Sequence, residues 1–159
     1  IGRASALTRD LKGYNYVSGY ASGNITKIIG RDGFLFLSGL DKTVDLESSG
    51  SSHLLVARYG AKPTLISIDL NEKQQTVIEG EKNISSLFSD SVSFWATYDN
   101  AGQSYLGKVV NGRLVDDQVL NCPFPLKIAV FQDRFFYTSL NDSEGKIYWI
   151  NKNLQRSGK

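Results

Sequence analysis

The sequence predicts an all-β fold, a β-propeller of four blades with four antiparallel strands in each blade. The first observation is a tandem repeat: the segment from Arg134 aligns without a gap on the segment from Ser93, an offset of 134 − 93 = 41 residues. Two further copies, from His53 and from Gly13, follow at offsets of 40. Propellers repeat at about 40–50 residues per blade, so the period indicates one blade per copy.

The second observation is that every copy contains an apolar run, a turn and a second apolar run, which is typical of a β-hairpin. The expected turns lie at residues 19–23, 60–63, 100–102 and 141–145. A leading strand is expected before each hairpin at residues 4–7, 44–46, 84–88 and 126–130, and an outer strand after the first three at 34–38, 75–78 and 115–120. We therefore expect one domain over residues 1–159, with blades at about 1–40, 41–80, 81–122 and 123–159.

The third observation separates blades from helical repeats of similar length. Helical arrays need apolar residues at i, i+3 and i+4 over ten or more residues, whereas these runs are short, β-branched or aromatic, and interrupted by 15 glycines. Four blades either close a ring or form part of a larger one. Too few residues follow Asn153 to form a clear outer strand of the fourth blade. Residues 2–10 could supply that outer strand only by leaving the first blade, so we favour a partial ring.

The segment SFWATYDNAGQSYLGKVVNGR, with Trp95, Ala96 and Thr97 at its core, resembles the YWTD-type repeat of low-density-lipoprotein-receptor propellers. The segment PLKIAVFQDRFFYTSLNDSEGKIYW resembles it too, and together the likeness covers residues 84–153. The aspartate of that repeat, which helps to join neighbouring blades in the family, is displaced here to Asp99, and Ser139 follows Thr138. The resemblance implies a receptor or matrix ectodomain that binds protein ligands on one rim or face, with no catalytic residues.

Composition narrows the classes of partner. The net charge is +2 and the basic residues are scattered, so the chain lacks the basic patch of a nucleic-acid-binding protein. No apolar run approaches the ~20 residues of a membrane-spanning helix. The absence of an initiating Met indicates a processed or excised chain.

Few residues favour catalysis or a cofactor, and we expect neither. Cys122 and His53 are the only residues of their types, which excludes an internal disulfide and Cys/His metal clusters. Residues 102–108 match most of a phosphate-binding loop, but Val109 stands where that loop needs Ser or Thr.

One enzymatic alternative stays open. Asp45, Asp90 and Asp133 recur at intervals of about 40 residues and could point together into the channel of a propeller that hydrolyses glycans. The competing interpretation is that these aspartates cap turns.

Three Asn-x-Ser/Thr sequons, at Asn24, Asn83 and Asn141, are compatible with a secreted or extracellular protein, and a periplasmic location is also possible.

The best candidates for binding are tyrosines expected at the hairpin tips. Tyr20, Tyr59 and Tyr98 recur every 39 residues, and tyrosine is enriched at protein interfaces. Arg58 and Asp99 lie beside them. The alternative is that these rings pack between blades. We expect a module that binds a protein ligand, or other chains that complete the propeller; a purely structural segment of a larger assembly is a third possibility.

Overall fold

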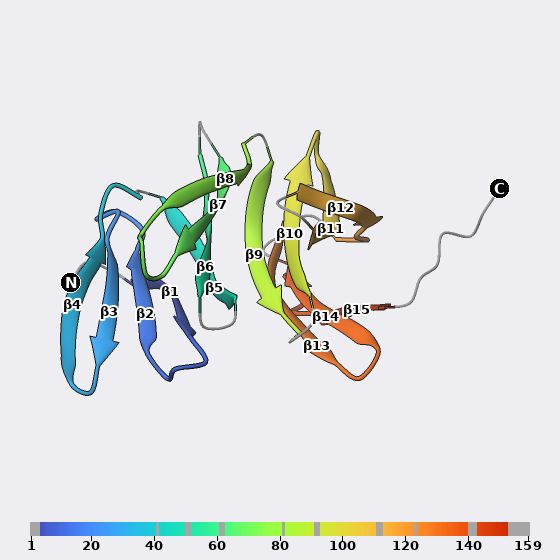
Figure 1. Ribbon diagram of the computed structural model, residues 1–159. Helices are drawn as coiled ribbons and strands as arrows, with labels where there is room; N and C mark the ends of the chain where they lie inside the picture. The colour runs from blue at the N-terminus through green and yellow to red at the C-terminus, as the bar shows by residue number, and fades with distance from the viewer. Residues whose placement is uncertain are drawn as a thin grey trace.

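The computed structural model describes residues 4–40, 42–49, 52–60, 63–80, 82–90, 93–110, 113–122, 124–139 and 143–152. This part of the chain contains fifteen strands and no helix. The strands form four separate antiparallel sheets that stand side by side (Figure 1). The predicted four-bladed propeller fold is confirmed.

Each blade is a meander in which strands adjacent in sequence are adjacent in the sheet. Blade 1 consists of β1 (Ala4–Arg9), β2 (Asn15–Gly19), β3 (Ile25–Ile29) and β4 (Asp32–Leu37). Blade 2 consists of β5 (Thr43–Ser49), β6 (His53–Arg58), β7 (Thr64–Asp69) and β8 (Gln75–Glu79). Blade 3 consists of β9 (Asn83–Ser89), β10 (Phe94–Asn100), β11 (Gln103–Val110) and β12 (Arg113–Val119). Blade 4 consists of β13 (Pro125–Phe131), β14 (Arg134–Ser139) and β15 (Tyr148–Asn151).

Blade 4 has three strands among the described residues, as the short chain after Asn153 led us to expect. Strand β1 pairs with β2, with Leu7 opposite Val17, so this segment leads the first blade and does not complete the last one. The inner strands pack in the order β1, β5, β9 and β13, while β13 and β1 are not packed against each other in the described chain. The blades therefore form an open arc.

The hydrophobic core is divided into three clusters, and each lies between two consecutive blades. The first cluster joins residues such as Tyr16 and Ile25 of blade 1 to Leu54 and Val56 of blade 2. Leu55, which lies between Leu54 and Val56 in β6, points to the other side of the sheet. It belongs to the second cluster, between blades 2 and 3. Successive residues of a strand face opposite sides of the sheet, so an unbroken apolar run is what a strand covered on both faces requires.

Blades 1 and 3 share an aspartate at the turn that follows their inner strand. In blade 1, Asp10 accepts a hydrogen bond from the Tyr14 backbone N–H at 2.9 Å and another from the Tyr16 hydroxyl at 3.3 Å. In blade 3, Asp90 accepts bonds from the Ser93 N–H at 2.7 Å and from Trp95 Nε1 at 3.2 Å. One carboxylate thus closes the turn and holds the polar tip of a core aromatic, which supports the turn-capping interpretation of Asp90.

Candidate binding site at the channel mouth

The inner strands of blades 2, 3 and 4 begin around one hollow of about 430 Å³. Val44, Ile84 and Pro125 line it, and each lies at or next to the first residue of its strand. Because β5, β9 and β13 pack side by side on the inner side of the arc, where a propeller has its central channel, the hollow lies at one end of that inner side. We call it the channel-mouth hollow; its remaining lining residues are Tyr59, Ser85, Asp99, Phe124, Leu126 and Lys127.

Two of the residues selected from the sequence, Tyr59 and Asp99, lie in the channel-mouth hollow. Tyr20 lies on the same rim, because the Lys42 N–H donates to the Tyr20 carbonyl at 2.7 Å and the Lys42 carbonyl accepts from the Tyr59 N–H at 3.0 Å. The side chains of Tyr20 and Tyr59 are both exposed. Arg58, at the end of β6, is partly buried and does not line the hollow.

Tyr98 corrects the expectation of three exposed tyrosines, because its side chain is only 1% exposed. It belongs to the cluster between blades 2 and 3, where its ring stacks on Tyr105 at 5.3 Å. Blades 2 and 3 repeat at 40 residues, whereas Tyr59 and Tyr98 are 39 residues apart. A shift of one residue along a strand moves a side chain to the other face, so Tyr98 cannot occupy the place that Tyr59 has.

The sequence did not single out Phe124, which forms one side of the hollow. This half-exposed aromatic has a φ of 49°, a left-handed conformation that is unusual and strained for a bulky side chain. Buried Ser104 holds it there: the Ser104 Oγ accepts from the Phe124 N–H at 3.2 Å and donates to the Asp99 carboxylate. The fold therefore keeps an apolar ring exposed beside a carboxylate.

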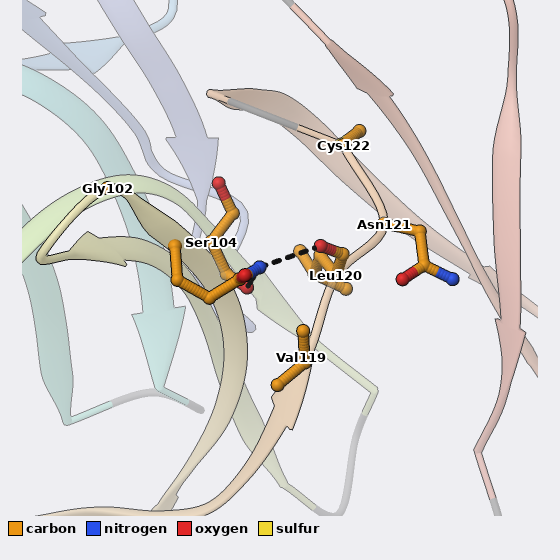
Figure 2. Close-up of a pocket in the computed structure, with 7 residues that line it drawn as sticks. Gly102, Ser104, Val119, Leu120, Asn121 and Cys122 are labelled. Carbon is orange, nitrogen blue, oxygen red and sulfur yellow. Dashed lines mark hydrogen bonds between the residues drawn. The ribbon is translucent and has the colours of Figure 1, made fainter.

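Two smaller hollows continue outward from the channel-mouth hollow. The first, of about 240 Å³, shares Asp99 and Phe124 with it, and the second, of about 300 Å³, shares Gly102 and Ser104 with the first. Figure 2 shows the second hollow. Gln103 lines it, and its Nε2 donates to the Leu120 carbonyl at 3.1 Å. The largely apolar channel-mouth hollow thus adjoins smaller, more polar hollows that are lined by blade 3 and by the connection to blade 4.

The aspartates of the enzymatic alternative do not occupy related points. Asp45 lies within inner strand β5, whereas Asp90 and Asp133 follow the last residues of β9 and β13. Asp45 is buried and accepts bonds from the Ser86 hydroxyl at 3.1 Å, the Leu87 N–H at 2.8 Å and Lys127 Nζ at 2.7 Å. Its carboxylate therefore ties blade 2 to blades 3 and 4, while Asp90 binds its own turn and the Lys152 ammonium.

Glu47, two residues after Asp45 on the same side of β5, is a titratable residue that the sequence did not indicate. Burial raises its pKa to about 7, with a further increase from the neighbouring Asp45 carboxylate. A hydrogen bond from the Ser89 backbone and the charge of Lys127 oppose this increase. The channel wall therefore holds a carboxyl group that titrates near neutral pH.

The remaining sequence candidates lie away from the hollow. His53 is exposed, with Nδ1 2.9 Å from the Ser52 hydroxyl and Nε2 3.8 Å from the Asp69 carboxylate, which is longer than a hydrogen bond. Asn24 and Asn83 are partly buried, and Asn141 lies outside the described residues.

No group of three His, Cys, Asp or Glu side chains in the described ranges could hold a metal ion. Within the same ranges, no helix has the length and apolar character needed to cross a membrane.

Comparisons with known proteins show the fold alone. No family model matches the chain, and no curated protein sequence is similar to it. A chain in a structure of a nidogen/laminin complex superposes with a TM-score of 0.77 at 11% identity, over 95% of this chain and 60% of that one. BamB from Moraxella catarrhalis gives 0.66 at 11% identity, over 98% and 48%. The Dos1 propeller gives 0.71 at 9% identity, over 94% and 45%. The chain therefore spans between about half and three fifths of these propeller-like chains.

Proposed function

We propose that this propeller binds a protein partner through the channel-mouth hollow. The observation that carries the proposal is the opening of 430 Å³ where three blades meet, lined mostly by apolar groups and flanked by the exposed rings of Tyr59 and Phe124. Concave, largely apolar sites with a few placed polar groups are the usual form of binding sites. Aromatic side chains at the centre of an interface contribute most of its binding energy.

The polar groups at the edge of the hollow suit a peptide segment. Asp99 lines both the channel-mouth hollow and the smaller hollow beside it, where its carboxylate can accept hydrogen bonds from backbone N–H groups or a cationic side chain. The similar chain in the nidogen/laminin structure comes from a protein complex, which supports a protein partner. The proposal has no catalytic step, because the Asp45 and Asp90 carboxylates are bonded to the protein itself.

A phage-displayed library of random peptides, selected on the 159-residue chain, tests this proposal. We expect selected peptides to lose at least about tenfold in affinity for Tyr59→Ala and for Phe124→Gly, because each change removes an aromatic contact worth more than 1.4 kcal/mol at an interface centre. Tyr20→Ala is the matched control, since it removes an equally exposed tyrosine from the same rim outside the hollow. Peptides that bind all three variants as tightly as the original chain would contradict the proposal.

We also propose that the chain is related to YWTD-type propellers and works outside the cytoplasm. Support comes from the repeat around Trp95 and Thr97, from the superposition on the nidogen-containing structure, and from the sequons at Asn24 and Asn83. The displaced aspartate has a functional counterpart in Asp45, which joins blades from a different strand. The test is detection of a glycan on Asn24 after passage of the chain through a eukaryotic secretory pathway.

A further inference from the structure

The two ends of the arc expose apolar sheet faces that correspond to faces buried inside it. In blade 1, Leu7, Val17, Thr26 and Leu35 lie in one row across the sheet, on the side away from blade 2. The same row in blade 2 consists of Leu46, Val56, Ile66 and Val77. Leu7 is 65% exposed, whereas its counterpart Leu46 is 2% exposed because blade 1 covers it. The end face of blade 1 thus has the residues of a blade interface without the covering blade.

Blade 4 exposes the other face of a blade interface, the one that an inner blade turns toward the next blade. Ala129, Phe136 and Trp149 form a row across its sheet, on the side away from blade 3. An offset of 41 residues relates them to Phe88, Trp95 and Lys108 of blade 3, and Trp95 is buried because blade 4 covers it. Trp149 is 51% exposed, with the Arg134 guanidinium 4.3 Å from its ring centroid. A contiguous exposed apolar face of this kind marks an interaction surface.

The two end faces are complementary in kind. Every interface within the arc joins two different faces. One is the face that a blade turns toward the next blade, and blade 4 exposes a face of this type. The other is the face that a blade turns toward the preceding blade, and blade 1 exposes a face of that type. A head-to-tail pairing of two identical chains reproduces this contact, and such pairing ends only when the ring closes. This chain covers 60% of the chain in the nidogen/laminin structure, 48% of BamB and 45% of the Dos1 propeller, so each of those three chains is long enough to hold more than one arc of this length.

We propose that two copies of this chain pair head to tail, blade 4 of each on blade 1 of the other, in a closed ring of eight blades. The proposal is independent of the channel-mouth hollow, which lies within one chain. Multi-angle light scattering on the 159-residue chain at micromolar concentration should give twice the 17.6 kDa mass of one chain, 2 × 17.6 = 35.2 kDa. A mass of 17.6 kDa, or a series of growing oligomers, would overturn the closed dimer.

Variants on the two faces test the geometry of pairing. Leu7→Asp and Trp149→Asp each replace a side chain that is exposed in the single arc, so both variants should keep their β-sheet circular dichroism and run as single chains. Val77→Asp is the matched control: Val77 is 62% exposed at the outer edge of blade 2, although blade 1 covers that face. This variant should remain a dimer.

Mixing the two monomeric variants separates head-to-tail pairing from any other dimer. The Leu7→Asp chain retains an intact blade 4 face and the Trp149→Asp chain retains an intact blade 1 face. An equimolar mixture should therefore form a mixed dimer with one interface, weaker than the original dimer but recovered by an affinity tag on one chain. Failure of the mixture to associate, or association of either variant alone, would show that the faces do not pair in this way.

Discussion

Asp45 of blade 2 and Lys127 of blade 4 form an ion pair, with Nζ 2.7 Å from Oδ1, although they are 82 residues apart and blade 3 separates their blades in sequence. The Asp45 side chain is almost completely buried, whereas that of Lys127 is largely exposed. The carboxylate also accepts bonds from the Ser86 hydroxyl and the Leu87 N–H of blade 3. One side chain therefore connects three inner strands.

The first prediction concerns the stability that Asp45 provides. Asp45→Asn should lower the free energy of unfolding by about 2–4 kcal/mol, because an amide loses the ion pair and can no longer accept all of the bonds. Lys127→Gln should cost less than about 1 kcal/mol, since its exposed ammonium is already solvated. Urea unfolding followed by tryptophan fluorescence measures both values. Equal losses for the two variants would mean that the ion pair, and not the bonds to blade 3, carries the effect.

The second prediction is a pH dependence from Glu47. Its pKa in the folded chain, about 7, is above the ordinary value of 4.5, so the folded state favours the protonated form. Its contribution to stability is complete below pH 4.5 and is lost as the pH rises through 7.

Glu47→Gln should therefore unfold like the original chain at pH 4.5 and be more stable by about 1–2 kcal/mol at pH 8.5, a figure reduced for the partial exposure of the group. Urea unfolding at several pH values measures the difference. A constant difference between the variant and the original chain across this range would rule out the shift.

The third prediction separates stability from binding at Phe124. Phe124→Gly should change the free energy of unfolding by no more than about 1 kcal/mol, because glycine adopts the positive φ without strain and this offsets its larger entropy loss on folding. The buried Phe135 is the matched control, and Phe135→Ala should cost about 3–5 kcal/mol. Thermal unfolding of both variants is the measurement. A large loss for Phe124→Gly would mean that the ring supports the fold.

The fourth prediction concerns the sequons. Asn24 lies in the turn before β3, whereas Asn83 lies in inner strand β9 opposite Asp99, with its Oδ1 buried. Chain secreted from eukaryotic cells should therefore carry a glycan at Asn24 and none at Asn83. In chains that also carry Asn141→Gln, Asn24→Gln and Thr26→Val should each abolish the gel shift produced by a glycosidase, and Asn83→Gln should leave it unchanged. A shift that persists in Asn24→Gln would place the glycan elsewhere.

Much of the fold could be predicted from the sequence because the blade repeat is carried by apolar residues that every blade needs. The row of Leu46, Val56 and Ile66, for example, recurs as Leu7, Val17 and Thr26 with nearly the same spacing. Asp10 was missed although it makes the same two bonds as Asp90, because its partner aromatic is Tyr16 instead of Trp95 and its turn is one residue longer. The two hydrogen bonds recur in both blades, but their partner residues differ in type and spacing, so comparing the sequences of the blades does not reveal them.

The site was only partly predictable. Tyr59 and Asp99 were selected as rim residues and line the channel-mouth hollow, but Tyr98 is buried because one residue of strand register decides its face. Phe124 could not be found from hydrophobic pattern, since its exposure depends on a positive φ that Ser104 stabilises from another strand. The signal available was an aromatic residue between two prolines, Pro123 and Pro125, in a connection between blades.

The division of the core into clusters between consecutive blades has a consequence for how the chain acquires its structure. None of the three clusters in the described part of the chain needs residues from blades that are distant in sequence, so each blade can dock onto the one made just before it as soon as the ribosome has released it. Among the described residues, the bond from Lys127 to Asp45 differs, because it forms only once the fourth blade is present. Docking of that blade would then add a contact that reaches back past blade 3 and fastens blade 2 as well.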